Sequence, residues 1–256
     1  MKFSIITVVY NGEKTIRRTV ESILNQKYLD YEYLIIDGLS SDSTLSIATS
    51  YTEQFQGRLK VYSEKDNGIY DAMNKGIKKA IGQYIWLINA DDYAEPDALL
   101  NIVTYYDSHP TQRDAILAGG VNLVDAKTGI IRRKEYADPF QFKARVKSLK
   151  MPISHPSAIV PKSVYDKVGL YDSNYYISGD IDFILRCYYA KVDFAFPSFI
   201  LSNMTDGGIS NRFPIRKNLH DYAIRSKRFC ANPIKRVLLQ IQYLFKIIIL
   251  RMHHGR

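Results

Sequence analysis

The chain has 256 residues, of which 46% are hydrophobic and 24% charged, and this balance excludes a disordered, collagen-like or coiled-coil protein. At this length one large domain, with or without an appendage, can bury its own core. Its two cysteines, Cys187 and Cys230, lie far apart in segments that we expect to be helical. We therefore expect reduced cysteines and a cytoplasmic protein. The apolar run at residues 3–9 is too short for a secretory signal.

The formal net charge of +9 is concentrated at the C-terminal end of the chain. Residues 212–256 contain 11 basic residues and one acidic residue, whereas residues 1–211 have a net charge of −1. The charge therefore describes the last segment and not the body. We predict a catalytic or binding domain at residues 1–211 and a basic helical extension at residues 212–256.

Short apolar runs alternate with amphipathic stretches over the first hundred residues, which predicts alternating strands and helices. Strands are predicted at 3–9, 33–37, 59–63 and 84–88, and helices at 13–26, 43–55 and 69–81. The strand at 33–37 is apolar at almost every position, which is typical of a mostly parallel sheet covered by helices on both faces. Such sheets bind ligands at the carboxyl ends of their strands. Polar clusters follow three of these ends, at residues 10–13, 37–42 and 89–92.

The later part of the chain predicts a mixed sheet. We expect helices at 97–107, 139–149, 162–168 and 180–190, a strand at 157–160, and a hairpin of residues 115–124 and 130–136 that turns at 127–129. Residues 236–250 have apolar positions at helical spacing. The apolar stretch is too short to cross a membrane, for which about 20 residues are needed, and Lys246 interrupts it.

Asp91 and Asp92 directly follow the apolar strand at 84–88. Adjacent carboxylates repel each other, and Mg²⁺ or Mn²⁺ would remove that repulsion and couple them to a diphosphate. The alternative is that one of the two acids caps the helix that begins near Pro96.

Two further polar groups lie where a nucleotide would bind. Asp37 ends the second strand beside Gly38, and its carboxylate can accept a hydrogen bond from a base or a ribose. Ser41 and Asp42 are better placed to cap the next helix, so we expect no structural role for Asp37. Asp71 and Asn74 share one face of the helix at 69–81, where a solvated polar face is the alternative interpretation.

In combination, five segments of the chain resemble the family 2 glycosyltransferases: residues 4–11, 37–44, 65–76, 82–92 and 178–186. The resemblance extends over about residues 1–210 and is strongest to the branch that acts in bacterial exopolysaccharide, colanic-acid-like and O-antigen assembly. It implies a GT-A fold, a nucleotide-binding α/β sandwich. It also implies transfer of a sugar from a nucleotide donor with inversion at the anomeric carbon.

The resemblance also implies roles for residues on the donor side. Asp37 would hold the base, Asp71 and Asn74 would contact the ribose and diphosphate, and Asp91 would be the direct metal ligand. The remaining residues of the implied nucleotide pocket are Val9, Tyr10, Asn11, Glu13 and Ala90. Asn89 stands where the DXD metal motif of the family has its first acid, and Asp92 follows the motif.

The catalytic base corresponds to Asp180, the second residue of the Glu-Asp pair of the family, whose first position is Gly179 here. At the start of a helix the helix dipole favours the ionised carboxylate, and one carboxylate must accept the proton of the acceptor hydroxyl. The alternatives are that Asp180 only caps the helix, or that Asp182 is the base. Asp182 is expected to face elsewhere.

Two other segments match the family on the acceptor side and near the C-terminal end. His155 falls in the acceptor-side segment, where a structural histidine is the alternative. Gly207 and Gly208 belong to a Gly-Gly-Ile-Ser segment that would form a flap over the donor phosphates, unless it is a plain turn.

We therefore predict an inverting glycosyltransferase that uses Mg²⁺ or Mn²⁺ and a UDP-sugar. Its acceptor would be a glycan or a polyprenyl-diphosphate-linked sugar in cell-surface polysaccharide synthesis. The basic extension would hold the protein on the anionic inner face of the plasma membrane, unless its helix packs on the domain, and no nucleic-acid partner is expected. A nucleotidyltransferase is one alternative, but it should have a Gly-rich basic phosphate loop after the first strand. An inactive membrane- or nucleic-acid-binding adaptor is the other, and the acids at three strand ends argue against it.

Overall fold

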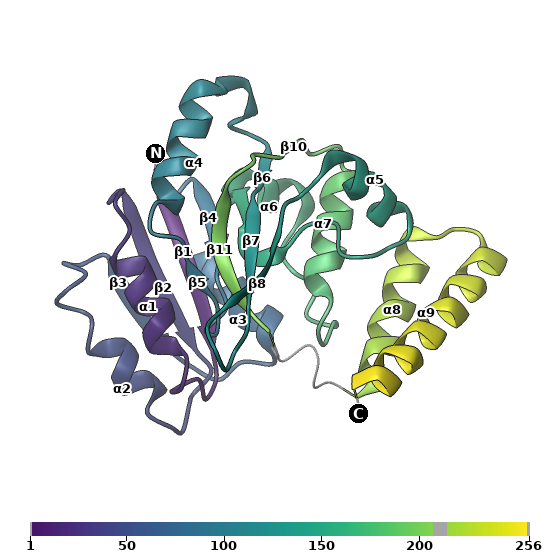
Figure 1. Cartoon of the computed structure of the whole chain (residues 1–256), viewed down its shortest axis with the longest axis horizontal. Coiled ribbons are helices and arrows are strands. Elements are labelled where there is room, and N and C mark those ends of the chain that lie inside the picture. Colours follow the sequence, from purple (N-terminus) through teal and green to yellow (C-terminus); the bar gives the residue numbers. More distant parts are fainter. Residues whose placement is uncertain (1, 207–213, 255–256) are drawn as a thin grey trace.

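The computed structural model describes residues 2–206 and 214–254 (Figure 1). It is an α/β protein, as predicted, but it has two sheets where one mixed sheet was expected. The strands of the main sheet are β1 (Phe3–Val9), β2 (Tyr31–Asp37), β3 (Leu59–Ser63), β4 (Tyr84–Leu87), β6 (Ile116–Ala118), β9 (Ala158–Pro161) and β10 (Phe194–Ala195). Their order is β10-β6-β9-β4-β1-β2-β3, and within it β9 runs antiparallel to both of its neighbours. The sheet is therefore mixed.

The first four strands are parallel, and their carboxyl ends meet at one edge of the sheet. Val9 pairs with Asp37, and Asp37 pairs with Ser63, so β1, β2 and β3 end at the same level. β4 is parallel to β1 on its other side. The loops that follow these four strands are consequently neighbours, although long stretches of chain separate them.

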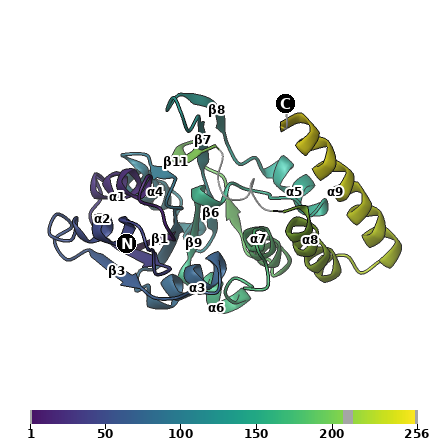
Figure 2. The same cartoon turned by 90° about the horizontal axis from the view of Figure 1, so that it is seen from below.

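Helices cover both faces of the main sheet (Figure 2). One core contains α1 (Ile16–Leu24), α2 (Thr44–Thr49) and α4 (Ala98–Ser108), and the other contains α3 (Ile69–Lys79), α5 (Pro139–Lys147), α6 (Lys162–Val168) and α7 (Gly179–Tyr189). Along β1, Ile5 packs into the first core and Ile6 into the second. This alternation explains why the strand is apolar at nearly every position.

The second sheet has the order β5-β11-β7-β8, formed by β5 (Tyr93–Ala94), β11 (Ile200–Thr205), β7 (Gly120–Val124) and β8 (Ile131–Glu135). The predicted hairpin is present in β7 and β8, but its first strand was predicted to begin too early, at residue 115. Residues 116–118 belong to the main sheet as β6, and the chain changes sheets at Gly119. A Cβ at Gly119 would lie 2.7 Å from the Leu201 side chain, so this close crossing depends on glycine.

Two helices follow the second sheet, α8 (Ile215–Phe229) and α9 (Pro233–His254). Both views show α8 between α7 and α9. Tyr222 of α8 stacks on Tyr243 of α9, with 4.1 Å between ring centroids. α9 is longer than the helix predicted at 236–250, and α8 lies within the extension predicted to be helical at 212–256, although no separate bounds were predicted for it. In the described part of the chain no helix combines the length and the apolar character needed to span a bilayer.

Candidate active site

The loop after β1 is joined to the loop after β2 by hydrogen bonds from short polar side chains. Asn11, which has a left-handed φ of 50°, accepts at Oδ1 from the backbone N–H of Ser41 at 2.9 Å. Glu13 accepts from the backbone N–H of Ser43 at 3.0 Å. Asn11 and Glu13 were predicted to line the nucleotide pocket, and their side chains here join the loop after β1 to the loop after β2.

Tyr10 and Val9 lie on either side of this loop. The Tyr10 ring is 63% exposed and stands against Gly38, where an added Cβ would come within 3.5 Å of it. Val9 is buried, and its side chain packs against Gly12, close to Ala90. The structure thus brings the loops after β1, β2 and β4 together, as predicted from their positions at the strand ends.

Asp37 is 1% exposed and has the structural role that the sequence did not predict. Its carboxylate accepts from the backbone N–H and the hydroxyl of Ser40 and from the hydroxyl of Ser63, the last at 2.6 Å. The expectation that Asp37 has no structural role was therefore wrong. Ser63, its partner in the adjacent strand β3, and Ser40, in the loop after β2, both donate a hydroxyl hydrogen bond to its carboxylate. A carboxylate offers about four acceptor positions, so these bonds leave room for a further donor.

Asp71 and Asn74 of α3 were expected to face a ligand together, but the structure gives them separate roles. Asp71 accepts from the backbone N–H of Asn67 at 2.9 Å and pairs with Lys75 at 3.6 Å. The Asn74 amide donates to the backbone carbonyl of Tyr171 at 2.8 Å and accepts from its N–H at 3.0 Å. With both of its polar atoms bonded to one backbone, Asn74 holds the segment before α7 rather than a ribose.

The loop after β4 is held in place by contacts to its backbone. Arg18 of α1 donates to the carbonyl of Asp91 at 2.8 Å and to the hydroxyl of Thr205 at 2.7 Å, and Thr205 also donates to that carbonyl. Thr19 donates to the carbonyls of Ala90 and Asp92. The end of β11 and the start of α1 therefore enclose this loop from both sides.

Asp92 is buried, and its carboxylate stabilises the loop after β4. It accepts from the Asn89 amide at 2.9 Å and from the backbone N–H of Thr205 at 3.0 Å. Burial, together with the neighbouring Asp91 carboxylate, raises the pKa of Asp92 to about 7. The alternative that Asp91 or Asp92 caps the following helix was wrong, because α4 begins at Ala98 and its N-cap position is Asp97.

The residues of the loop after β4 fit a hard divalent cation that is also bound by a substrate phosphate. The described residues contain no group of three or more His, Cys, Asp or Glu side chains that could hold a metal by themselves. Asn89 and Asp92 are bonded to each other, and Asp91 is partly exposed at the sheet edge. Mg²⁺ is typically held by one or two carboxylates together with substrate phosphates and water, and a single partly exposed carboxylate suits that arrangement.

Asp180 is the second residue of α7, whose N-cap position is Ser178, so the alternative that Asp180 only caps the helix was wrong. Its carboxylate accepts from the N–H of Ile181 at 2.8 Å and from the hydroxyl of Tyr70 at 3.4 Å. Burial raises the pKa of Asp180, while the Ile181 N–H and, at neutral pH, Arg225 act against this rise. A carboxylate with a raised pKa is a stronger base than an ordinary aspartate.

His155 and Tyr70 form the surroundings of Asp180. Burial lowers the pKa of His155, so the ring is neutral at pH 7, and its Nε2 lies 3.2 Å from the Tyr171 hydroxyl. Burial raises the pKa of the Tyr70 hydroxyl well above its ordinary value, so this group stays protonated and can donate to Asp180. A Cβ at Gly179 would lie 2.9 Å from the Tyr70 ring. Glycine at this position therefore allows Tyr70 to approach the carboxylate.

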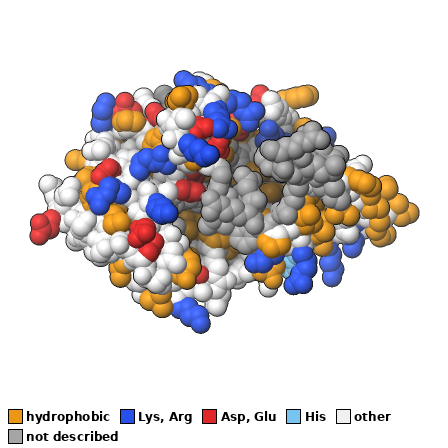
Figure 3. Space-filling model, turned by 60° about the horizontal axis from the view of Figure 1, so that its bottom comes forward, with side chains coloured by type: hydrophobic (Ala, Val, Ile, Leu, Met, Phe, Trp, Pro, Cys, Tyr) orange, Lys and Arg blue, Asp and Glu red, His pale blue; other side chains and the backbone are white. Residues whose placement is uncertain are grey.

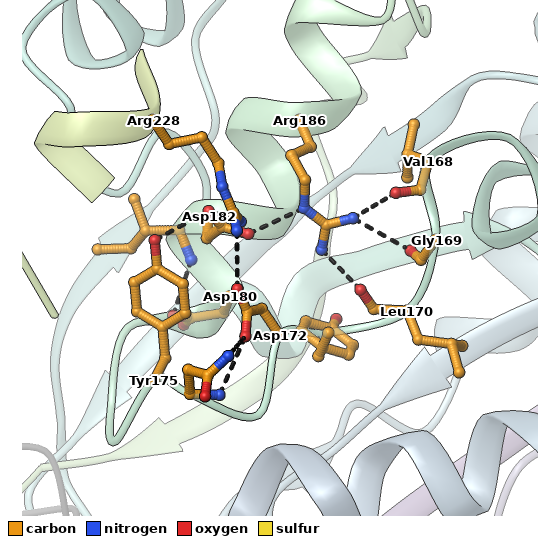
Figure 4. Close-up of polar contacts among 12 residues, drawn as sticks. Val168, Gly169, Leu170, Asp172, Tyr175, Asp180, Asp182, Arg186 and Arg228 are labelled. Carbon is orange, nitrogen blue, oxygen red and sulfur yellow. Dashed lines mark hydrogen bonds and ion pairs between the residues drawn. The ribbon is translucent and has the colours of Figure 1, made fainter. Parts of the chain in front are cut away.

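Asp182, the alternative base, is fully buried and bound by cations (Figure 4). Arg186 of α7 donates to one of its oxygens at 2.8 Å, and Arg228 of α8 donates to the other at 2.6 Å. The Tyr175 hydroxyl adds a third bond at 2.9 Å. Asp182 therefore links α7 to α8 and is not accessible to a substrate.

Gly207 and Gly208 lie outside the described residues.

Four residues that the sequence did not single out are central to the site: Arg18, Tyr70, Asn67 and Thr205. Each acts through a partner far away in the chain or through a backbone group. No local pattern could have identified Arg18 or Thr205, whereas Tyr70 lies within a segment that already resembled the family.

Comparison with known proteins agrees with this geometry. The family model described as "Glycosyl transferase family 2" matches residues 4–169. A "PGL/p-HBAD biosynthesis glycosyltransferase" of Mycobacterium tuberculosis is 28% identical over 187 residues, which cover 73% of this chain and 69% of that protein. An "Uncharacterized glycosyltransferase" of the same species is 31% identical over 72% of this chain and 67% of its own length.

Solved structures share the fold. TarS of S. aureus superposes with a TM-score of 0.70 at 19% identity, over 93% of this chain but only 41% of the TarS chain. A TarS fragment, residues 1–349, in complex with UDP-GlcNAc gives 0.69 at 18% identity, over 95% and 72% of the two chains. The mannosyltransferase PcManGT of Pyrobaculum calidifontis, in complex with GDP-Man and Mn²⁺, gives 0.64 at 20% identity, over 94% and 69%. The family match, which covers more than half of the chain, shows that this protein belongs to glycosyl transferase family 2.

Proposed function

We propose that the protein transfers a sugar, with inversion at the anomeric carbon, from a UDP-sugar to a hydroxyl of a glycan or of a polyprenyl-diphosphate-linked acceptor in cell-surface polysaccharide synthesis. One observation carries the proposal. Asp180 has a raised pKa and lies beside a neutral histidine and a protonated tyrosine, while Asp91 stands in a separate, rigid loop at the end of β4. Two carboxylates in different environments suit two different tasks, proton removal and support of a leaving diphosphate.

In the proposed reaction the acceptor oxygen attacks the anomeric carbon on the face opposite the diphosphate. The bond between that carbon and the diphosphate oxygen breaks, and the proton of the acceptor hydroxyl passes to the Asp180 carboxylate. Tyr70 donates to that carboxylate and orients it, and no covalent intermediate is needed. The neutral His155 ring lies near the Asp180 carboxylate, and we assign it to the acceptor side.

On the donor side we assign the base to the wall formed by Tyr10, Gly38 and Asp37, and the diphosphate to the loop that contains Asp91. The exposed Tyr10 ring offers a stacking surface, and Asp37 keeps an acceptor position for a base N–H. Mg²⁺ or Mn²⁺ bound through Asp91 would neutralise the charge that develops on the departing UDP. The UDP-GlcNAc complex of TarS and the Mn²⁺ complex of PcManGT support both assignments by analogy.

A thermal-shift screen of UDP, GDP and their sugars, with and without Mn²⁺, tests the donor assignment. We expect UDP compounds to raise the melting temperature most, and Mn²⁺ to increase that effect. The sugar nucleotide selected in this way then serves in a UDP-release assay with candidate acceptors. Equal affinity for UDP in the presence and absence of metal would contradict the role given to Asp91.

We also propose that α9 holds the enzyme on an anionic membrane. Among the described residues of α9, five large apolar side chains are exposed: Ile234, Val237, Leu238, Ile241 and Phe245. The last four follow Ile234 by three, four, seven and eleven residues, so all five lie on one face of the helix and form an apolar stripe. The opposite side of the helix packs on α8, where the Gln240 amide donates to the Ser226 hydroxyl at 2.9 Å. Figure 3 shows hydrophobic side chains gathered at the end of the molecule where α9 lies, with Lys and Arg side chains beside them.

The charge of the segment supports an anionic membrane as the partner. Residues 212–256 have a net charge of +10, and anionic head groups contribute about 1 kcal/mol for each basic residue near the surface. Val237→Ser combined with Ile241→Ser should release the protein from phosphatidylglycerol vesicles while UDP affinity stays the same. Leu29→Ser, which changes an equally exposed residue far from the stripe, is the matched control. Unchanged sedimentation of the double variant would contradict the proposal.

A further inference from the structure

The turn that carries Asp180 is held by two buried charged residues of α8, in the segment expected to be only an extension. Asp221 is 1% exposed and Arg225 is 2% exposed. Asp221 accepts three consecutive backbone N–H groups, those of Tyr176 at 3.0 Å, Ile177 at 2.8 Å and Ser178 at 3.0 Å. These are the three residues that lead into α7.

The hydroxyl of Ser178 completes this arrangement. It donates to Asp221 at 3.1 Å and accepts from the Arg225 guanidinium at 2.7 Å. Serine at an N-cap position normally bonds to its own helix, but Ser178 makes no such bond. Its hydroxyl is bound instead to α8, and Arg225 also donates to the carbonyl of Leu149 at 3.1 Å.

We infer that Asp221 and Arg225 are positioning residues for Asp180: they fix the turn from Tyr176 to Ser178, and Arg225 supplies a positive charge beside the carboxylate. The inference rests on the proposed role of Asp180 as the base. A buried charged pair could have been replaced by apolar residues if α8 only needed to pack on α7. α8 also contacts Asp172 and Asp182 through Arg228, and these bonds do not involve the turn from Tyr176 to Ser178.

The charged and titratable groups that face Asp180 come from four elements. Tyr70 belongs to α3, His155 and Tyr171 belong to the segments before α6 and α7, and Arg225 and Asp221 belong to α8. Tyr70 and Tyr171 are neutral because burial raises the pKa of each hydroxyl, and His155 is neutral because burial lowers its pKa. Among the described residues, Arg225 is therefore the cation that acts on the Asp180 carboxylate at neutral pH, and it lowers the pKa that burial raises.

The test is a pH-dependent mutant cycle that needs no substrate. The gain in melting temperature caused by Asp180→Asn is measured from pH 4 to 9 in the wild-type background and in the Arg225→Gln background. Without the guanidinium, this gain should become larger and the pH at which it levels off should move upward, and Arg225→Lys should restore both. Arg228→Gln, which removes another cation of α8, is the matched control and should lower the melting temperature without moving that pH. Identical behaviour of the two backgrounds would overturn the inference.

Kinetics provide the second measurement. For Ser178→Ala, which keeps both charges and removes only the hydroxyl between them, we expect unchanged affinity for UDP with Mn²⁺ and a decrease in kcat of up to about 100-fold, the cost of a small misplacement. The decrease should be absent in the Asp180→Asn background, which already lacks the base. An equal decrease in both backgrounds, or no decrease at all, would overturn the inference. If Asp180→Asn alone leaves transfer intact, the proposed function fails, whereas the pH cycle still reports on Arg225.

Discussion

The donor side and the base side of the site are held in different ways. On the donor side, Asn11, Glu13 and Asp37 bond to groups about 30 residues away or closer, and their partners are hydroxyls and backbone amides of neighbouring loops. On the base side, the turn before Asp180 is bound by two buried charged residues of α8, more than 40 residues further along the chain. The donor side therefore depends on the sheet edge, and the base side depends on a separate helix.

This difference predicts separable consequences. Changes near Asp91 should act on nucleotide and metal binding, because the β4 loop does not contact α8 in any bond described above. Changes around Asp180 should act on turnover and on the pH dependence of stability. The following predictions test this separation, beginning with the largest expected effect.

The largest effect is expected for Asp180→Asn, which keeps the shape of the side chain and removes its basicity. UDP affinity should persist, and transfer should decrease by roughly 10²–10⁴-fold, the usual contribution of a positioned base. Calorimetry with UDP and Mn²⁺ and the UDP-release assay measure the two quantities separately.

Asp182→Asn is the control for this prediction. Because Asp182 is bound by Arg186 and Arg228, its replacement should lower the melting temperature substantially. If the Asp182 variant lost transfer at full stability while the Asp180 variant kept it, the two roles would be reversed.

A smaller effect is expected for Asp91→Ala. It should remove the metal-dependent part of the UDP affinity, a coupling that is typically about 5–150-fold, and leave the metal-free affinity in place. Titrations of UDP with Mn²⁺ and with EDTA measure this coupling. A loss of metal-free affinity of the same size would mean that Asp91 shapes the pocket and does not hold a cation.

Asn74 connects the two sides of the site. It belongs to α3, on the donor side, and bonds to the backbone of Tyr171 in the segment before α7. Asn74→Leu leaves the N–H and carbonyl of Tyr171 unpaired, and each buried unpaired group costs about 1–3 kcal/mol. Urea unfolding should therefore show a clear loss of stability. Asn74→Asp keeps the acceptor and loses the donor, so its loss should be intermediate. Equal losses would show that the two bonds do not act independently.

The same difference explains which parts the sequence could predict. The strand ends and the residues that follow them were found because hydrophobic periodicity and turn residues are local signals, and these signals placed Asp37, Asp91 and the loop at 10–13 at one edge. Asp180 was predicted to be the base from a motif alone, and this stays a prediction. Its surroundings were not predicted, because nothing near Asp180 in the chain indicates Asp221 or Arg225.

Some local expectations were wrong for a related reason. Asp37 and Asn74 were judged by their own helix or strand, whereas their partners, Ser63 and Tyr171, come from a neighbouring strand and a distant loop. Polar side chains can satisfy backbone groups anywhere in the fold, and a single sequence does not show which groups need them. The division of the chain at residue 211, by contrast, stays a prediction.

The smallest expected effect concerns stability and again involves Asp180. Because its pKa is raised in the folded protein, the folded state binds this proton more tightly than the unfolded chain does. The ionised carboxylate therefore destabilises the protein at neutral pH, and this cost disappears as the pH falls toward about 4, where an ordinary carboxyl group also becomes protonated. Asp180→Asn should raise the melting temperature at pH 7, and the gain should shrink as the pH is lowered. A gain in melting temperature that did not change with pH would contradict this explanation. It would mean that asparagine packs better than aspartate and that the ionised Asp180 carboxylate does not destabilise the fold.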